Sequence, residues 1–233
     1  HSSLPEASYS YAIPAEFRRQ GLRRFGFHGI NHQHVAESMA QRWRQQGRDP
    51  SGLRLISAHL GAGSSLAAVK AGVCIDTTMG FTPLEGLVMA TRSGTVDPGL
   101  LLELMRRGYS ESAITEILQK NSGLKGLSGI SGDMRQIRAA AASGHEAATV
   151  ALDVFRHRLL QLIGSMASSL QGVDVLALTG GIGEHDNQLR AELKDSLSWL
   201  CDMEILVIPA DEEGMIARLC RRQSDATVSA AIG

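Results

Sequence analysis

Two glycine-rich turns, each directly after an apolar run, carry the clearest chemical signal in the sequence. The first lies in "SAHLGAGSS", residues 57–65, and the second in "ALTGGIGEH", residues 177–185. Without side chains, the backbone N–H groups of such turns can approach a ligand closely, and phosphate oxygens are natural acceptors. Neither turn matches the dinucleotide fingerprint or the Walker loop. A tight turn without a ligand is the alternative for either one alone, whereas the pair favours a nucleotide-binding fold.

Two single side chains, Arg92 and His28, could add charge or hydrogen bonds to such a site. Arg92, among small residues in "ATRSGTVDPG", could clamp a carboxylate or phosphate with its planar guanidinium, although most arginines are exposed or ion-paired. His28, between an aromatic residue and a glycine, is expected to donate to a charged ligand. His32 and His34 are expected on the exposed face of the helix that follows. A metal site on these histidines is disfavoured, because no cysteine or carboxylate completes it nearby.

An acidic cluster, Asp211 to Glu213, stands where a strand gives way to a helix. Acidic residues in a first helical turn stabilise the helix dipole, which is the simpler interpretation. The functional alternative is a carboxylate that holds Mg²⁺ directly or through water.

Hydrophobic periodicity places these residues on alternating strands and helices. The first half predicts a strand followed by a hairpin that turns at Ala71 and Gly72, and the second half predicts a parallel sheet covered by helices. The fold class is therefore α/β, with a mixed sheet flanked by helices. Helices are expected at 31–47 with Asn31 as a cap, from Pro98, from a cap at Ser110, at 145–172, at 188–200 and from about Glu212. Strands are expected at 53–60, 64–78, 173–180 and 203–211. A weakly ordered tail is expected from residue 223.

Composition narrows the functional classes. The chain has 233 residues and a net charge of −1, which gives no reason to expect a nucleic-acid or anionic-membrane partner. No apolar run approaches the length of a membrane span, and no secretory signal is visible at the start. Three scattered cysteines suggest reduced thiols and a cytoplasmic location.

Longer motifs then occur in a diagnostic order: "RRFGFHGINH", "AHLGAGSS", "DTTMGFTPLEGLVMATRSGTVDP", "GLKGLSGISGDMR", "TGGIGE" and "VIPADEE". Together they resemble the acetate kinase (acetokinase) family, which includes propionate and butyrate kinases, from Arg23 to about Ala217. The resemblance implies the ribonuclease H-like fold of the actin, sugar-kinase and heat-shock-chaperone superfamily. It also implies ATP or ADP with Mg²⁺, a short-chain carboxylate substrate, direct phosphoryl transfer to give an acyl phosphate, and a homodimer. The chain would then comprise a remnant of the N-terminal domain with a linker (1–27), a C-terminal nucleotide-binding domain (28–217) and a tail (218–233).

The resemblance also implies roles for particular residues. His28 and Arg92 match the family's transition-state residues, Glu212 its magnesium-associated glutamate, and Pro83 a wall of the pocket for the acyl group. The positions expected to bind the nucleotide are His59, Gly61, Ala62 and Gly63 at the phosphates, Asp133, Met134 and Arg135 at the adenine, and Gly181, Ile182 and Gly183 at the nucleoside.

Four departures from the family pattern qualify these expectations. The first phosphate loop and the magnesium aspartate upstream of His1 are absent from the sequence given. Ala62 replaces a typical asparagine, Ile30 and Asn31 replace two small hydroxyl residues, and the connection 184–207 is short. We therefore expect the chain alone to bind ATP weakly without turning over acetate. A propionate or butyrate kinase, or a non-catalytic nucleotide-binding remnant, is the alternative.

Overall fold

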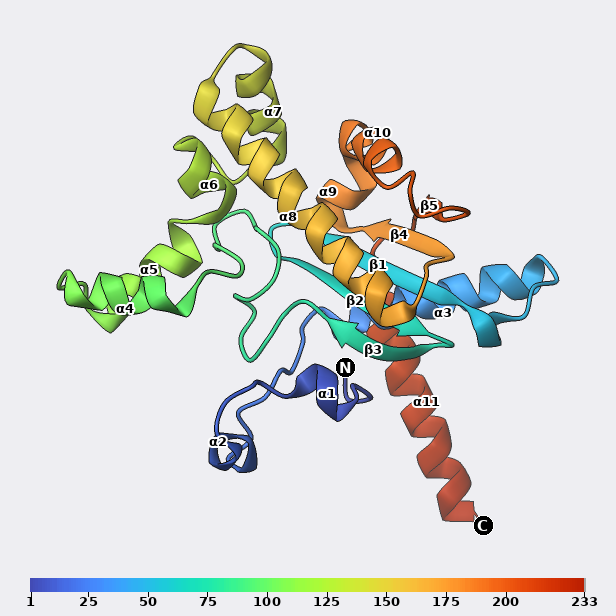
Figure 1. Cartoon of the computed structure of the whole chain (residues 1–233). Helices are drawn as coiled ribbons and strands as arrows, with labels where there is room; N and C mark the ends of the chain where they lie inside the picture. Colours follow the sequence, from blue (N-terminus) through green and yellow to red (C-terminus); the bar gives the residue numbers. More distant parts are fainter. Residues whose placement is uncertain (233) are drawn as a thin grey trace.

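A computed structural model of the chain describes the backbone of residues 1–232 and the side chains of residues 1–225. Within this part, one five-stranded sheet has the order β3-β2-β1-β4-β5 (Figure 1). The first three strands pair antiparallel, while β4 is parallel to both β1 and β5. The predicted mixed sheet, with an antiparallel first half and a parallel second half, is confirmed. The strands are β1 (Arg54–Leu60), β2 (Ser64–Lys70), β3 (Val73–Thr77), β4 (Val175–Thr179) and β5 (Glu204–Val207).

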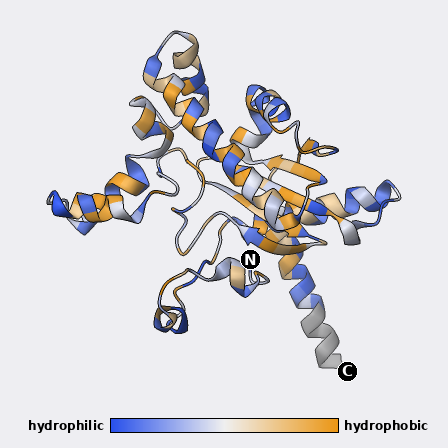
Figure 2. Ribbon diagram, viewed as in Figure 1, coloured by the Kyte–Doolittle hydropathy of each residue, from blue (hydrophilic) through white to orange (hydrophobic). Residues whose placement is uncertain are grey.

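One face of the sheet is covered by the long helix α8 (Glu146–Leu170), which crosses the strands in Figure 1. Its buried residues recur at helical spacing, and they pack on the side chains of β1, β2 and β4 that alternate toward this face. Phe155 and Leu159 are typical of them. Burial of each such side chain contributes about 1.5–3 kcal/mol. Figure 2 shows apolar strands beneath a helix whose outer side is polar.

The opposite face is covered by α3 (Gly29–Gln45), and α11 (Glu212–Ile232) packs against α3. Val35, Met39 and Trp43 of α3 recur at helical spacing, as expected, and pack against Leu55 and Val175 of the sheet. Every residue of β4 is buried, as expected for a strand covered on both faces.

The remaining helices surround the sheet. Pro98 begins α4 behind an Asp97 cap, and Ser110 caps α5 through the N–H of Ala113, so both predicted starts are confirmed. The short helices around the glycine motifs were not predicted, because their sequences lack a long apolar period. The remaining helices are α1 (Glu6–Tyr9), α2 (Ala15–Arg19), η1 (Pro50–Gly52), α4 (Pro98–Arg106), α5 (Glu111–Lys120), α6 (Gly123–Ser128), α7 (Met134–Ala142), α9 (Gly180–His185) and α10 (Asn187–Ser196). Of these, only α4, α5 and α10 were predicted.

The N-terminal segment is tied to the loop that follows β3. Arg24 donates to the carbonyl oxygens of residues 77–79 and pairs with Glu85 at 2.6 Å. The Tyr11 hydroxyl donates to the other oxygen of the same carboxylate at 2.5 Å. Burial and this hydrogen bond raise the pKa of Tyr11 to about 12. The network therefore fixes the base of the loop that carries Pro83 and Arg92.

Two local expectations were wrong. Asn31 is not a helix cap: α3 begins after His28, and Asn31 is fully buried with its amide against the sheet. The expected tail does not begin at Gln223, since the backbone of α11 is helical to Ile232. No glycine or proline interrupts the sequence between Met215 and Ile232, so nothing local stops this helix. Gly233 lies outside the described residues.

We expect Gly180→Ala to destabilise the fold by about 2 kcal/mol. Gly180 has a φ of +79°, and an added Cβ would lie 2.8 Å from the carbonyl oxygen of Leu60 on the neighbouring strand. Gly181→Ala is the matched control, because a Cβ there meets nothing within 4 Å. Urea unfolding of both variants measures the difference. Equal stabilities would contradict the proposed constraint.

Candidate active site

His28 and Arg92 converge on the first glycine turn. A Cβ built on Gly63 would lie 3.1 Å from His28 Nε2 and 3.4 Å from Arg92 Nη1. His28 is the residue before α3 and adopts a left-handed backbone (φ 57°). Non-glycine residues in this region carry strain that is common at functional sites. A donor from each of two distant segments therefore faces the same small space.

The guanidinium of Arg92 is held from one side only. Its Nη1 donates to the carbonyl oxygen of Pro83 at 3.0 Å and contacts the sulfur of Met89 at 3.6 Å. Within the described residues it has no carboxylate partner. Its charge is therefore available to an anionic ligand, and the predicted acyl-pocket residue lies next to it.

Strand alternation supplies the polar floor of this space. Ser57 and His59 on β1, Ser65 on β2 and Thr179 on β4 occupy the positions that face α3, and the register places His59 beside both Ser65 and Thr179. Farther from this end of the sheet, the same face is apolar, with Leu55 on β1, Val69 on β2 and Val175 on β4. The chemistry-bearing side chains thus gather at the end of β1 and β4, where α/β sheets bind ligands.

Two histidine rings stack in the site. The rings of His28 and His59 have centroids 4.3 Å apart with an interplanar angle of 20°. Burial, together with the charges of His59 and Arg92, lowers the pKa of His28 to about 4. Burial also lowers the pKa of His59, against an opposing effect of Glu212 and Glu184. Both rings are therefore neutral near pH 7 and can each offer an N–H to an anion.

His32 is buried, which corrects the expectation that it lies on the exposed face of its helix. Only 4% of the residue is exposed, and its ring nitrogens contact Ser57 and Ser65. Burial lowers its pKa well below 6.5. The spacing from His28 to His32 is one helical turn, so a site-facing His28 predicts an inward His32; this signal was available in the sequence. His34 instead contacts the carbonyl oxygen of Pro209 and the side chain of Arg218.

We expect the stability of the protein to fall as the pH falls from 6.5 toward 4. In this window the unfolded chain protonates His28, His32 and His59 at a higher pH than the folded chain does, because folding lowers all three pKa values, so unfolding takes up protons. Urea unfolding from pH 4.5 to 7.5 measures the slope. His28→Gln should flatten it, whereas His157→Gln, which removes an exposed histidine of α8, should not. A stability that does not change with pH would show that the three histidines are not held neutral in the folded protein.

The first glycine turn has free backbone donors. The N–H of Gly61 donates to the carbonyl of Gly63 and to the Ser64 hydroxyl. The N–H groups of Ala62 and Gly63 have no hydrogen-bond acceptor among the described residues. Such paired N–H groups suit phosphate oxygens.

A pocket of about 650 Å³ continues from this turn. One wall is the second glycine turn, with Gly181 and Ile182, and the other is the start of α7, with Met134 and Arg135. Met134 is buried beneath it. Most residues predicted to hold the nucleoside are thus brought to one cavity; Gly183 is buried behind the turn and does not line it. Asp133 caps α7, and its ion pair with Arg135 at 2.6 Å is accompanied by a carboxyl pKa lowered to about 2.

The sequence profile of the Acetokinase family matches residues 1–205. The chain belongs to the acetokinase family. It is 45% identical to an acetate kinase of Acaryochloris marina, over 96% of this chain and 60% of that protein. Its fold matches the crystal structure of an acetate kinase from Porphyromonas gingivalis with a TM-score of 0.87 and 37% identity, over 93% of this chain and 60% of the other.

A propionate kinase from Francisella tularensis is also similar, with a TM-score of 0.86 and 36% identity over 93% of this chain and 60% of the other. The α/β fold implied by the sequence resemblance is confirmed by these structures. The chain spans about 60% of the length of these relatives.

Arg138 is a pocket residue of this acetokinase chain that sequence reasoning missed. It lines the cavity from α7 and pairs with Asp186 at 2.8 Å and with Glu192 at 3.3 Å. These pairs join the two walls, and the Arg138 side chain is largely buried. Its position one turn after Met134 and Arg135 was the available signal.

Glu184, in the motif that opens α9, also has a structural role that was not predicted. One carboxylate oxygen accepts from the N–H of Gly180 and from that of Ala210, each at 2.9 Å. It therefore links the second glycine turn to the segment that leads into α11.

Glu212 is an exposed residue in the first turn of α11, and its charge raises the pKa of His59. Among the described residues, no cluster of three or more histidine, cysteine or acidic side chains could hold a metal alone. Mg²⁺ usually takes one or two carboxylates together with substrate phosphates and water. Glu212 is a single carboxylate near the first glycine turn, so it could hold Mg²⁺ in this way only together with the phosphates of a bound nucleotide.

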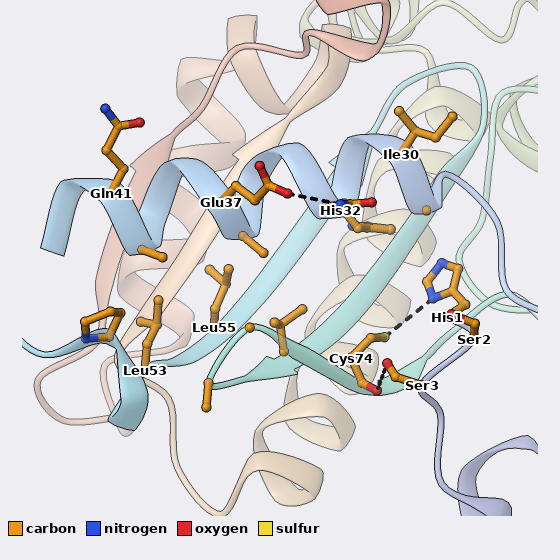
Figure 3. A pocket seen from close by; sticks show the side chains of 18 of the residues that line it. His1, Ser2, Ser3, Ile30, His32, Glu37, Gln41, Leu53, Leu55 and Cys74 are labelled. Atoms are coloured by element: carbon orange, nitrogen blue, oxygen red, sulfur yellow. Dashed lines mark hydrogen bonds between the residues drawn. The ribbon is translucent and has the colours of Figure 1, made fainter. Parts of the chain in front are cut away.

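A larger pocket, of about 1190 Å³, lies elsewhere, along α3. Figure 3 shows the helix from Ile30 to Gln41 on one side, Leu53 and Leu55 below, and Cys74 beside the first residues of the chain. Neither glycine turn lines it. Size therefore does not single out the pocket beside the glycine turns, whereas the free backbone donors and the convergence of His28 and Arg92 do.

Two further properties bear on the expectations for the whole protein. No described helix has the length and apolar character needed to cross a membrane. The three cysteines, Cys74, Cys201 and Cys220, are free.

Proposed function

We propose that this chain is the nucleotide-binding part of a kinase that transfers the γ-phosphoryl group of ATP to a short-chain carboxylate, reversibly. The reaction with acetate yields acetyl phosphate and ADP. The observation that carries the proposal is the convergence of His28 Nε2 and Arg92 Nη1 at Gly63, at the mouth of the pocket that contains Gly61 and Ile182. The homologous acetate kinases support the same chemistry.

The chemistry needs no general base, because the attacking carboxylate is already an anion. One of its oxygens forms a bond to the γ-phosphorus while the bond to the β-phosphate oxygen breaks, and the charge passes to ADP. Negative charge spreads over the equatorial oxygens of the migrating group. Arg92 and His28 would donate to those oxygens, and the N–H groups of Ala62 and Gly63 would hold the phosphates that leave. His59 would donate from the stacked ring.

The nucleotide would lie with its phosphates at the first turn and its nucleoside at the second. Gly181 and Ile182 would contact the nucleoside opposite Met134, with Gly183 allowing the turn to lie close to β4. Glu212 would hold Mg²⁺, which supplies charge neutralisation when it is bound to the phosphates. Ala62 offers only its backbone N–H at this position.

Pro83 would form a wall of the pocket for the acyl group, since its carbonyl holds Arg92. Acetate is the substrate we propose, and the similar propionate kinase makes propionate the second candidate. We further propose that residues 28–217 form the nucleotide-binding domain, that 1–27 are a remnant of the N-terminal domain with a linker, that 218–233 are a C-terminal tail, and that the enzyme acts in the cytoplasm.

We propose that the protein forms a homodimer through the helices α4 and α5. Leu100, Leu102 and Met105 of α4 are exposed apolar side chains, and Figures 1 and 2 show α4 and α5 extending away from the sheet with apolar patches. Exposed apolar patches of this kind mark association surfaces. Size-exclusion chromatography with light scattering tests the mass, and Leu102→Asp should yield a monomer.

Hydroxamate detection of acyl phosphate tests the function. The chain alone and a chimera with the N-terminal portion of the Acaryochloris marina enzyme are compared with acetate, propionate and butyrate. Acyl phosphate from the chimera supports the kinase, and the relative rates identify the carboxylate. ATP binding by both proteins without acyl phosphate from any acid would favour a non-catalytic nucleotide-binding role instead.

A further inference from the structure

A continuous chain of hydrogen bonds runs from His28 into the core. The Nδ1 of His28 lies 2.9 Å from the Ser65 hydroxyl, which lies 2.8 Å from Nε2 of His32. The other ring nitrogen of His32 lies 2.8 Å from the Ser57 hydroxyl. Ser57 and Ser65 are fully buried and His32 nearly so. Water cannot complete these bonds, so the four groups must satisfy one another.

The fold explains why these side chains meet. Ser57 and Ser65 lie on neighbouring strands β1 and β2 at positions that face α3. His32 is one turn along α3 from His28 and reaches down between the two serines. The arrangement therefore follows from the period of two in the strands and the turn spacing of the helix.

The single hydroxyl hydrogen of Ser65 couples the tautomer of His28 to the tautomer of His32. A neutral imidazole has one N–H donor and one acceptor nitrogen, and a serine hydroxyl has a single hydrogen to donate. If Ser65 donates to His28, it must accept from His32; if it donates to His32, it must accept from His28. Both rings therefore carry their hydrogen on Nε2, or both carry it on Nδ1.

Ser57 decides between these directions. Its hydroxyl has no hydrogen-bond partner other than His32 among the described residues. With hydrogens on Nδ1, His32 would donate to Ser57, and the buried Ser57 hydrogen would have no acceptor. With hydrogens on Nε2, Ser57 donates to His32, His32 donates to Ser65 and Ser65 donates to His28, so every buried hydrogen in the chain of hydrogen bonds has an acceptor. A buried unsatisfied donor is costly, so the second direction is favoured.

The geometry points to His32, with Ser57 and Ser65, as a positioning residue that keeps the hydrogen of His28 on Nε2, the nitrogen that faces Gly63 and Arg92. This inference deepens the proposed function and rests on it for its catalytic meaning. The donor would then be in place before phosphoryl transfer begins, and no tautomer change would be needed during the reaction.

Nitrogen NMR of the chain labelled with ¹⁵N-histidine tests the tautomer directly. Long-range proton–nitrogen correlations distinguish a hydrogen on Nε2 from one on Nδ1, and loss of signals in His28→Gln and His32→Gln assigns the two rings. We expect Nε2–H for both His28 and His32 at pH 7. A hydrogen on Nδ1 of His28 would overturn the proposal.

Ser57→Ala tests the coupling, because Ser57 does not touch His28. We expect the His28 nitrogen shifts to move toward an average of the two tautomers, while the control Ser128→Ala, which removes a buried hydroxyl outside the chain of hydrogen bonds, leaves them in place. His28 shifts that Ser57→Ala does not move would also overturn it. His32→Leu should reproduce the effect of Ser57→Ala, whereas His32→Gln, which keeps one donor and one acceptor, should preserve the His28 tautomer.

Kinetics of the active chimera separate this inference from the function itself. Ser57→Ala should lower kcat about tenfold with the KM for ATP unchanged, because it disorders a donor used in the transition state. An unchanged kcat would overturn the positioning role. If the unaltered chimera makes no acyl phosphate, the proposed function fails, while the NMR result still decides the tautomer.

Discussion

Arg92→Ala should lower the turnover of the active protein at least a hundredfold, which corresponds to about 3 kcal/mol of barrier. The guanidinium faces the same space as His28 Nε2 and has no carboxylate partner among the described residues. Its loss would remove charge where the migrating phosphoryl group accumulates it. ATP affinity should change little, because Arg92 does not line the pocket formed by the second glycine turn and α7.

The measurement combines hydroxamate kinetics with calorimetric titration of ATP. Arg92→Lys keeps the charge but loses the planar fork, so it should retain an intermediate turnover. Arg107→Ala is the matched control, since that arginine is exposed and its one ion pair with the described side chains is with Glu103 on α4. Near-normal turnover in Arg92→Ala, or an equal loss of ATP binding and turnover, would remove Arg92 from the transition state.

Gly181→Leu should weaken ATP binding by at least about tenfold without destabilising the fold. A Cβ on Gly181 would meet no atom within 4 Å, and the residue lines the pocket proposed to hold the nucleoside. The new side chain would therefore occupy the cavity rather than the core, and a tenfold loss corresponds to about 1.4 kcal/mol.

Gly52→Leu is the control for adding an exposed leucine. Gly52 is exposed in η1, and a Cβ there also meets nothing within 4 Å. Calorimetric titration of ATP and thermal unfolding are measured for both variants. Unchanged ATP affinity in Gly181→Leu would place the nucleoside elsewhere, whereas a lowered unfolding temperature would show that the side chain enters the core.

Much of the fold was predictable from local sequence patterns. The long apolar period of α8, the buried run of β4, the hairpin turn at Ala71 and Gly72, the Ser110 cap and the helix start at Pro98 all act within a few residues. The helices α6, α7 and α9 were not predicted, because they are short and rich in glycine or alanine. Asn31 was misassigned because a polar residue near a helix start resembles a cap when its burial is unknown.

The sequence by itself determined the family, the mixed sheet and the residue types available for the proposed phosphoryl transfer, because motifs and hydrophobic periods depend only on residues close together in the chain. Only the tertiary structure decided which of those residues share a space. Strand pairing and the packing of α3 bring His28, Gly63 and Arg92 together and turn His32 inward onto Ser57 and Ser65. Arg138 pairs with Asp186 in the pocket proposed for the nucleoside. These contacts link segments far apart in the chain, and burial of apolar faces, which is a property of the whole fold, fixes where each segment lies.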